Sequence, residues 1–286
     1  GKSRFENNCL PYMEQDIYRY HSLDVVVSDH HCLDCIVMYQ GKLIRPWVTT
    51  FQDYRSGKIL GWCPCVTPSS LSIIVAYYMV CYRYGIPITV LFDNGKDYHS
   101  KLLNGSIERI KIKLDDCTEE ETEVKFSGIF HAVGSSVQFT RVYNGKSKGR
   151  QERYFRVLGE YLAKDMGSYV GSDSRTRPEE AQLMFRAING MAKRNDIPQW
   201  KDFVTACNSM VEYINDRVVT QAKGTKGMTR SQAFERFLPE NVRKADKALL
   251  QAALCKGEVR QVKRNGFTIN GINYWHPDLL VHYGTK

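Results

Sequence analysis

Three carboxylates along the chain have the type and setting that metal-dependent phosphoryl transfer needs. Asp29 follows the apolar run VVVS, Asp93 ends the apolar segment ITVLFD, and Glu152 lies within the basic stretch GKSKGRQERYF. Carboxylate oxygens suit Mg²⁺ or Mn²⁺, because these hard cations bind oxygen and retain exchangeable waters. Two such ions roughly 3.5 to 4 Å apart promote in-line displacement at phosphorus. The three acids therefore predict a site for two divalent ions.

Basic residues flank the third of these acids. The chain has a net charge of +9 and a pI near 9.0, which favours a polyanionic partner. Beside a metal site such cations are expected to hold the phosphates of a nucleic acid, which makes binding steeply salt dependent. A solvated charged face, with Glu152 as a local counter-ion, is the alternative. The cations in question are Lys146, Lys148, Arg150, Arg153 and Arg156.

The elements that must position these residues are visible in the hydrophobic pattern. The segments VVVSDHHCLDCIVMY, PWVTTFQDY and KILGWCPCV read as strands, separated by turn signals at 40–41 and 55–57. A helix is predicted next, capped by Thr67 with Pro68 at its first position and ending at Gly85. The segment ITVLFD, apolar on both faces, then reads as a central parallel strand.

This order predicts an α/β fold with a ribonuclease-H-like mixed five-stranded sheet and flanking helices. In that architecture the first strand and the strand after the helix lie side by side, which brings Asp29 next to Asp93. Glu152, on the first turn of a later helix, completes the group. A helical segment and a small β module of alternating strands with Asn-Gly turns follow.

The domain organisation follows from the same pattern. The acidic segment 96–125 is left open as an insertion or a flap. We expect modules that recognise DNA ends to lie outside this chain and the last module to be cut short. The predicted units are an N-terminal extension (1–20), a catalytic domain with a helical extension (21–222), a helical connector (223–256) and a small β-barrel-like module (257–286).

Three segments carry a resemblance to a known family. SDHHCLDCIVMYQGKLIRPWVTTFQDYRSGKILGW, YGIPITVLFDNG and GKSKGRQERYF resemble the catalytic segments of DDE-type transposases and integrases, and are most similar to phage Mu-like transposase cores. FQDYRSGKILGW and SKGRQER are the most specific parts. The long interval between Asp93 and Glu152 is similar to that of the Mu-like group. The proline often found before the last acid is absent here.

The resemblance implies a DNA transposase that nicks transposon ends by hydrolysis and joins the released 3′-hydroxyl to target DNA. It implies that Asp29, Asp93 and Glu152 form the metal-binding triad, with Asp93 bridging two ions. It also implies a homo-oligomer on paired DNA ends and an activator protein as a partner. A ribonuclease-H-like nuclease or resolvase that does not join strands is one alternative, and an inactive DNA-binding assembly protein is another.

Other residues that could take part in catalysis or metal binding are better explained by structural roles. Asp24, Asp34 and Asp53 compete with Asp29 for the role of first acid, and Asp53 is interpreted as a structural turn residue. Two cysteine pairs, CLDC at 32–35 and CPC at 63–65, suggest zinc. Strand alternation makes a closed zinc site hard to assemble there, so they are interpreted as small core residues. Core positions are also predicted for Trp62, Trp200 and Trp275.

The compartment is predicted from composition. The chain has nine cysteines in 286 residues, scattered through strand and helix patterns. It shows neither a secretion signal nor an apolar run of the roughly 18 residues that a membrane span needs. These features indicate reduced thiols and a cytoplasmic, nucleoid-associated protein in a bacterial or phage-infected cell.

Overall fold

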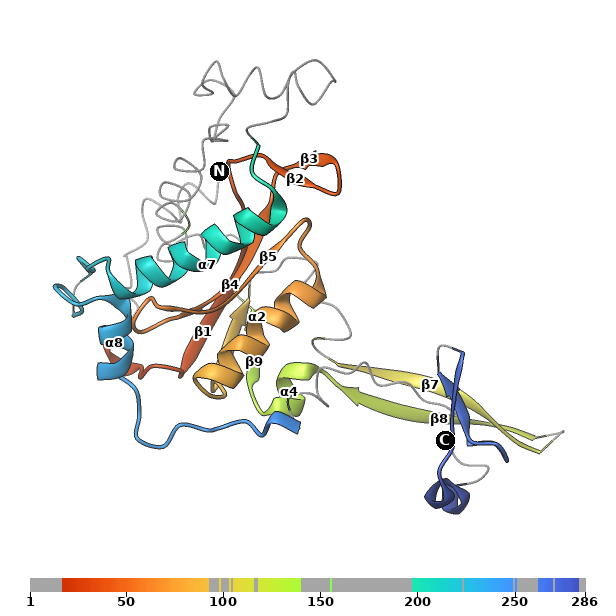
Figure 1. The fold of residues 1–286 in the computed structure, drawn as a ribbon. Helices are drawn as coiled ribbons and strands as arrows, with labels where there is room; N and C mark the ends of the chain where they lie inside the picture. Colours follow the sequence, from red (N-terminus) through yellow and green to blue (C-terminus); the bar gives the residue numbers. More distant parts are fainter. Residues whose placement is uncertain are drawn as a thin grey trace, which may run out of the picture.

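A five-stranded mixed sheet forms the centre of the computed structural model (Figure 1). The structure describes residues 17–92, 98, 103, 105–115, 118–139, 155, 197–222, 224–248, 250, 262–269 and 271–282. The sheet has the strand order β5-β4-β1-β6-β9. Its strands are β1 (Val25–Cys32), β4 (Trp47–Asp53), β5 (Ile59–Cys65), β6 (Thr89–Phe92) and β9 (Ser136–Phe139).

The strand directions confirm the predicted fold class. β1 pairs antiparallel with β4, and β4 pairs antiparallel with β5, which is the meander expected from the turn signals. On its other side β1 pairs parallel with β6, and β6 pairs parallel with β9. This is a ribonuclease-H-like mixed sheet with β1 at its middle.

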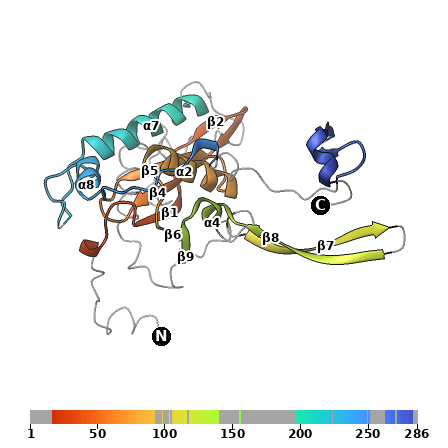
Figure 2. The same ribbon diagram turned by 90° about the horizontal axis from the view of Figure 1, so that it is seen from below.

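Helices cover both faces of the sheet (Figures 1 and 2). α2 (Ser70–Arg83) and the short α4 (Ile129–Val133) contribute to one buried cluster, together with sheet residues such as Phe51 and Val90. α7 (Trp200–Asp216) contributes to a second cluster, which includes Val48. No helix among the described residues is both long and apolar enough to cross a bilayer.

The start of α2 differs from the sequence prediction. Thr67 was expected to cap the helix, but Ser69 is the N-cap. The Ser69 hydroxyl accepts from the Ser72 N–H at 3.3 Å, and the Ser72 hydroxyl oxygen accepts from the Ser69 N–H at 3.2 Å. This reciprocal pair satisfies two backbone donors at once, which a cap at Thr67 would leave unpaired.

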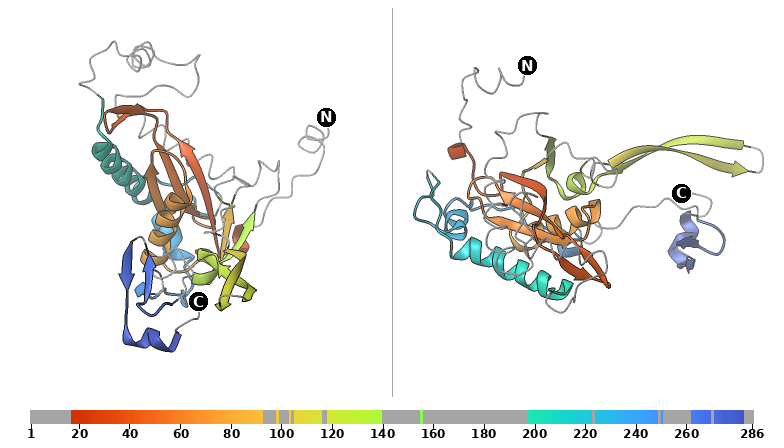
Figure 3. Two further views of the ribbon diagram at one scale, coloured as in Figure 1. Left: turned by 90° about the vertical axis from the view of Figure 1, so that its right-hand side faces the viewer. Right: turned by 90° about the horizontal axis from the view of Figure 1, so that it is seen from above.

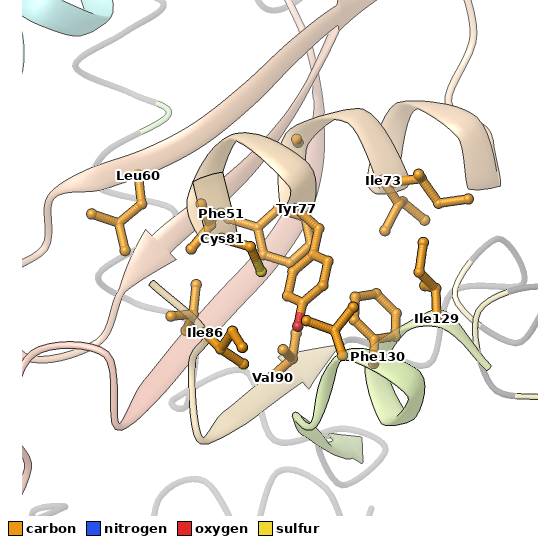
Figure 4. Close-up of a cluster of buried hydrophobic side chains, with 14 of the residues drawn as sticks. Phe51, Leu60, Ile73, Tyr77, Cys81, Ile86, Val90, Ile129 and Phe130 are labelled. Carbon is orange, nitrogen blue, oxygen red and sulfur yellow. The ribbon is translucent and has the colours of Figure 1, made fainter. Parts of the chain in front are cut away.

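The first cluster is centred on Tyr77 of α2 (Figure 4). Its ring packs between Phe51 and Phe130, with ring centroids 5.7 and 4.7 Å away. Its hydroxyl pairs with Ser135 Oγ at 2.7 Å, and Ser135 donates to the Pro87 carbonyl at 2.6 Å. The phenol therefore ties α2 to the segments that enter β6 and β9 without leaving a buried polar atom unpaired.

A bulge in β5 changes which of its side chains point to each face of the sheet. The β4–β5 register shifts between Phe51 and Gln52, which leaves Leu60 as an extra residue. Ile59 and Trp62 consequently join the second cluster, while Leu60 joins the first. Next to the bulge, a Cβ on Gly61 would lie 2.0 Å from the Ala76 carbonyl, so only glycine allows α2 to pack this closely.

The FQDYRSGKILGW segment makes a tight turn around a buried carboxylate. Asp53 accepts from the N–H of Leu23 at 2.9 Å and from the N–H and hydroxyl of Ser56 at 2.7 and 2.6 Å. Burial raises the pKa of the Asp53 carboxyl above its ordinary value, while these hydrogen bonds lower it. The interpretation of Asp53 as a structural turn residue is confirmed.

A long antiparallel ribbon lies between β6 and β9 in the sequence and projects from the sheet (Figures 2 and 3). It consists of β7 (Gly105–Asp115) and β8 (Thr118–Ser127). In the backbone register, Arg109 is opposite Glu123 and Lys111 is opposite Glu121. Most of the described residues in the segment left open as an insertion or a flap therefore belong to an inserted ribbon.

The remaining elements are short. Near the start are η1 (Ile17–Arg19), β2 (Val37–Tyr39) and β3 (Lys42–Ile44), and after α7 comes α8 (Arg230–Arg236). Towards the end, β10 (Phe267–Ile269) and β11 (Ile272–Tyr274) form a hairpin, followed by η5 (Pro277–His282).

The predicted core positions of the tryptophans are only partly correct. Trp62 is buried, and Trp200 packs partly buried against the second cluster. Trp275 is 55% exposed, so its predicted core position is wrong. Trp275 directly follows β11, and a two-stranded hairpin is too small to surround such a side chain.

Replacing Asp53 by Asn tests the importance of the turn. The amide would direct N–H groups at the Ser56 donors, so we expect the free energy of unfolding to fall by about 1–3 kcal/mol, measured by urea denaturation. The exposed Glu240→Gln serves as the charge-matched control and is expected to change stability by less than about 0.5 kcal/mol. Equal stability of the two variants would contradict the structural role.

Candidate active site

Asp29 lies on β1, the central strand of the sheet, and its side chain is partly buried. It is directly opposite Thr50 on β4 in the antiparallel register. Its Oδ1 accepts from the N–H of the following residue, His30, at 2.9 Å. Because side chains alternate along a strand, Asp29 and His31 share one face of β1, while Ser28 and His30 share the other.

Tyr98 anchors the chain beyond β6 to one face of β1. Its ring stacks on His30 with centroids 4.8 Å apart and on Phe92 with centroids 4.6 Å apart. Its hydroxyl and the Ser28 hydroxyl are 3.2 Å apart. Phe92 directly precedes Asp93, and Tyr98 comes five positions after it. The described residues on both sides of Asp93 in the sequence therefore pack together beside β1.

Phe155 makes the corresponding contact on the opposite face of β1. Its ring stacks on His31 with centroids 4.6 Å apart and planes 12° from parallel. The side chain is 4% exposed and belongs to the second cluster, with Val211 and other residues of α7. Phe155 follows Glu152 by three positions. This stack fastens the end of the basic stretch to the strand that carries Asp29.

A hydrogen-bond chain connects β1 to the start of α2. His30 Nδ1 and Thr49 Oγ1 are 2.8 Å apart, and Thr49 Oγ1 donates to Ser72 Oγ at 2.9 Å. Ser72 Oγ in turn donates to the carbonyl of the N-cap residue Ser69 at 2.8 Å. This hydrogen-bond chain connects the His30 ring to the start of the helix that packs on the sheet. Sequence reasoning did not find it, because its members are far apart along the chain.

Burial and nearby carboxylates act in opposite directions on His31, beside Asp29. Burial lowers the pKa of the His31 imidazole below its ordinary value, although the carboxylates of Asp34 and Asp29 raise it. Asp34 forms an ion pair with Arg45. Asp34, a rival for the first acid, is thus paired with a cation and follows the end of β1, whereas Asp29 lies within the strand.

The other predicted site residues lie outside the described residues. These are Asp93, Glu152 and the five basic residues, so their positions as ligands or phosphate contacts stay predictions. Within the part of the chain that the structure describes, no group of three or more His, Cys, Asp or Glu side chains could hold a metal ion. Asp29 is the one member of the predicted triad in this part.

The cysteine pairs give no support to a zinc site. Cys32, Cys35, Cys63 and Cys65 are free thiols. Burial raises the pKa of the Cys35 thiol to about 12 and that of Cys63 to about 11, which disfavours the thiolate that zinc requires. Cys35 is fully buried in the second cluster, in agreement with its interpretation as a small core residue.

The surroundings of Asp29 suit a divalent cation bound by oxygen atoms better than a metal bound by thiolates. Asp29 presents a carboxylate, the ligand type that Mg²⁺ and Mn²⁺ prefer. The opposing Thr50 hydroxyl is buried and has no hydrogen-bond partner within the described ranges, so a donor is available to support a ligand. The stacks at His30 and His31 fix the strand on either side. The described part of the site is thus compatible with an oxygen-ligated ion.

Known proteins show similarity to much of this chain. The model of the family described as Bacteriophage Mu transposase matches residues 20–236. Mu-like prophage FluMu transposase A of Haemophilus influenzae is 26% identical over 177 residues, which are 57% of this chain and 25% of that protein. The chain thus spans about a quarter of the length of this relative.

Two solved structures are similar to a lesser degree. A chain of the simian T-cell lymphotropic virus intasome in complex with PP2A regulatory subunit B56 gamma is 16% identical, with a TM-score of 0.44 over 87% of this chain and 64% of that chain. The HTLV-2 integrase catalytic core domain in complex with magnesium, trimeric form, is 14% identical, with a TM-score of 0.40 over 73% and 95%. Likenesses this weak carry no information about function.

A double-mutant cycle tests the stack between His31 and Phe155. We expect His31→Leu and Phe155→Leu each to lower the free energy of unfolding, and the double variant to lose less than the sum. The difference should be about 0.5–1.5 kcal/mol, the range found for stacked ring pairs. The matched cycle uses Tyr39→Leu and Phe155→Leu, because the Tyr39 ring packs on Trp200 instead. Strict additivity in the His31 cycle would show that the stack is not formed.

Proposed function

Because the chain belongs to the bacteriophage Mu transposase family, we propose that it is the catalytic part of a DNA transposase. It nicks transposon ends by hydrolysis and joins the resulting 3′-hydroxyl to target DNA. Asp29, Asp93 and Glu152 hold the divalent cations that the reaction needs. Membership of the family supports the class of reaction, and the arrangement around β1 supports the choice of residues.

The observation that carries the proposal is the register of the parallel pair β1 and β6. Val25 pairs with Thr89, Val26 with Val90, and Val27 with Leu91. If it continued by two positions, this register would pair Asp29 with Asp93. Neighbouring strands are about 4.8 Å apart, so two carboxylates in this relation suit a shared cation. We therefore expect the first two acids to be lateral neighbours.

The position of Phe155 supports Glu152 as the third ligand. Sequence pattern predicts a helix from Gln151, and residues three apart on a helix share a face. Phe155 packs on His31, which shares its face of β1 with Asp29. Glu152, one helical turn before Phe155, is thus expected on the side of the helix that meets Asp29.

Each residue contributes to holding and orienting the reactants. When bound, two Mg²⁺ or Mn²⁺ ions supply charge stabilisation at the attacking and leaving oxygens of the phosphodiester. Asp29 and Glu152 would each hold one cation, and Asp93 would contribute to holding both. The rings stacked on His30 and His31, one on each face of β1, help to keep the Asp29 carboxylate in place. No covalent bond between protein and DNA is required.

DNA is the expected partner along the basic stretch. Lys146, Lys148, Arg150, Arg153 and Arg156 bind phosphates and guide the scissile bond to the acids. The protein acts as a homo-oligomer on paired DNA ends, with an activator protein, in the cytoplasm of a bacterial or phage-infected cell. Membership of the family and the net charge of +9 support these aspects of the proposal.

Replacing Asp93 by Asn tests the catalytic proposal. Loss of one ligand charge should reduce both end cleavage and strand joining at least about 10³-fold, while DNA binding stays within about threefold. The assay uses labelled transposon-end DNA, with a pre-cleaved end to isolate joining. Asp24→Asn is the control, because Asp24 precedes β1 and accepts from its near neighbour His21, which an Asn oxygen can also do.

The same assay separates the alternative functions. Joined product from the wild-type chain supports a transposase. Cleavage of end DNA without joining, even from a pre-cleaved end, would indicate a nuclease or resolvase. Binding without either reaction would indicate an assembly protein, and full activity of the Asp93 variant would refute the assigned triad.

The role of the basic stretch is tested by salt dependence. Replacing Lys146, Lys148 and Arg150 together by Ala should reduce the slope of log K against log salt by about 2–3, measured by fluorescence anisotropy. A matched triple variant at the exposed Lys201, Lys226 and Lys247 should leave the slope within about one of the wild-type value. Equal slopes for the two triple variants would exclude phosphate contacts by these residues.

A further inference from the structure

Thr50 is a buried polar residue next to Asp29 that the proposed mechanism does not yet use. It lies on β4 and is directly opposite Asp29 in the antiparallel pairing with β1. Residues in this relation project from the same face of the sheet, with Cβ atoms about 4.5–5.5 Å apart. The Thr50 hydroxyl is therefore within reach of the Asp29 carboxylate.

The Thr50 hydroxyl lacks a hydrogen-bond partner within the described part of the chain. Its side chain is 0% exposed, and its Oγ1 makes no hydrogen bond to a described residue. The adjacent Thr49 faces the other side of the sheet, where its hydroxyl bonds to both His30 and Ser72. Buried hydroxyls without partners are rare because they lose the hydrogen bonds of water without replacement. Thr50 is in this respect unlike its neighbour.

The neighbours of Thr50 on this face offer few acceptors. Across the other edge of β4, Thr50 pairs with Trp62, whose indole N–H donates to Asn208 Oδ1 at 2.7 Å and which has no acceptor atom. Two positions along β4, Gln52 directs its amide N–H to the Gly57 carbonyl at 2.9 Å. Of the two cross-strand neighbours of Thr50, Asp29 is the one that carries an acceptor.

We propose that Thr50 is a positioning residue for the cation site: its hydroxyl donates to the Asp29 carboxylate when a divalent cation is bound and fixes the orientation of that ligand. The inference rests on the proposed function, since it assumes that Asp29 binds a cation. In the structure, Asp29 Oδ1 accepts from the N–H of His30. When a carboxylate binds a cation through one oxygen, a hydrogen bond donated to its second oxygen fixes the orientation of the group.

Mn²⁺ binding to the full chain, measured by electron paramagnetic resonance of the free ion, tests this proposal. Thr50→Val keeps the shape of the side chain but removes the hydroxyl. We expect it to weaken Mn²⁺ binding about 10-fold, and Thr50→Ser to bind within about threefold of wild type. Without divalent cations, the melting temperature of Thr50→Val should equal or exceed that of wild type, because a buried unpaired hydroxyl is lost.

Thr49→Val is the matched control on the neighbouring position. It removes a hydroxyl that is hydrogen-bonded in the fold, so the melting temperature should fall while the Mn²⁺ affinity stays close to wild type. This pattern is opposite to the one expected for Thr50→Val. A lower melting temperature for Thr50→Val without cations, or an unchanged Mn²⁺ affinity, would overturn the role of Thr50.

Asp29→Asn separates failure of this inference from failure of the proposed function. If wild type binds Mn²⁺ and Asp29→Asn does not, the cation site stands and the Thr50 variants decide the inference. If wild type shows no saturable binding that depends on Asp29, the cation site itself is wrong, and the role of Thr50 is refuted with it.

Discussion

The pairing of β1 with neighbours of opposite orientation is the constraint on which the rest of the structure depends. β4 runs antiparallel on one side and β6 runs parallel on the other. A parallel neighbour requires a crossover, which α2 supplies, and a crossover helix must cover one face of the sheet. β1 therefore lies at the middle of the sheet, where β4 pairs with it from Val26 to Cys32 and β6 pairs with it from Val25 to Val27.

The two faces of β1 are stabilised in similar ways but by different parts of the chain. On one face, Tyr98 stacks on His30 and Phe92. On the other, Phe155 stacks on His31 within the cluster formed with α7. Aromatic stacking restrains both the distance between two rings and their relative orientation. The two stacks therefore restrain the His30 and His31 side chains on either side of Asp29. The two histidines that flank Asp29 thus have a structural explanation that requires no metal.

Sequence pattern predicted the elements whose signals are local. A hydrophobic period or an apolar run marks each of these elements in the sequence. They are the three strands of the meander, the buried α2 and the strand ITVLFD. The start of α2 was misplaced because two serines form a better cap than Thr67. The β7–β8 ribbon was not predicted, since its alternating charges resemble a solvated loop until cross-strand partners are known.

The surroundings of Asp29 were predictable to a smaller degree. Asp29 itself stood out because it follows an apolar strand, and Asp53 was correctly separated from it as a turn residue. Tyr98, Phe155 and the Thr49 hydrogen-bond chain could not be found, because each contact joins residues distant in the sequence. The burial of Thr50 likewise depends on which residues face it across the sheet.

The inserted ribbon also determines how this fold tolerates changes in length. Its two ends are paired with each other, Gly105 with Ser127, so the chain leaves the domain and returns to it at nearly the same point. Added or deleted cross-strand pairs would therefore change the reach of the ribbon without moving β6 or β9. Because side chains alternate with a period of two, changes of two residues per strand would preserve the facing of every remaining pair. The reach of the ribbon can thus evolve separately from the spacing of β1, β6 and β9.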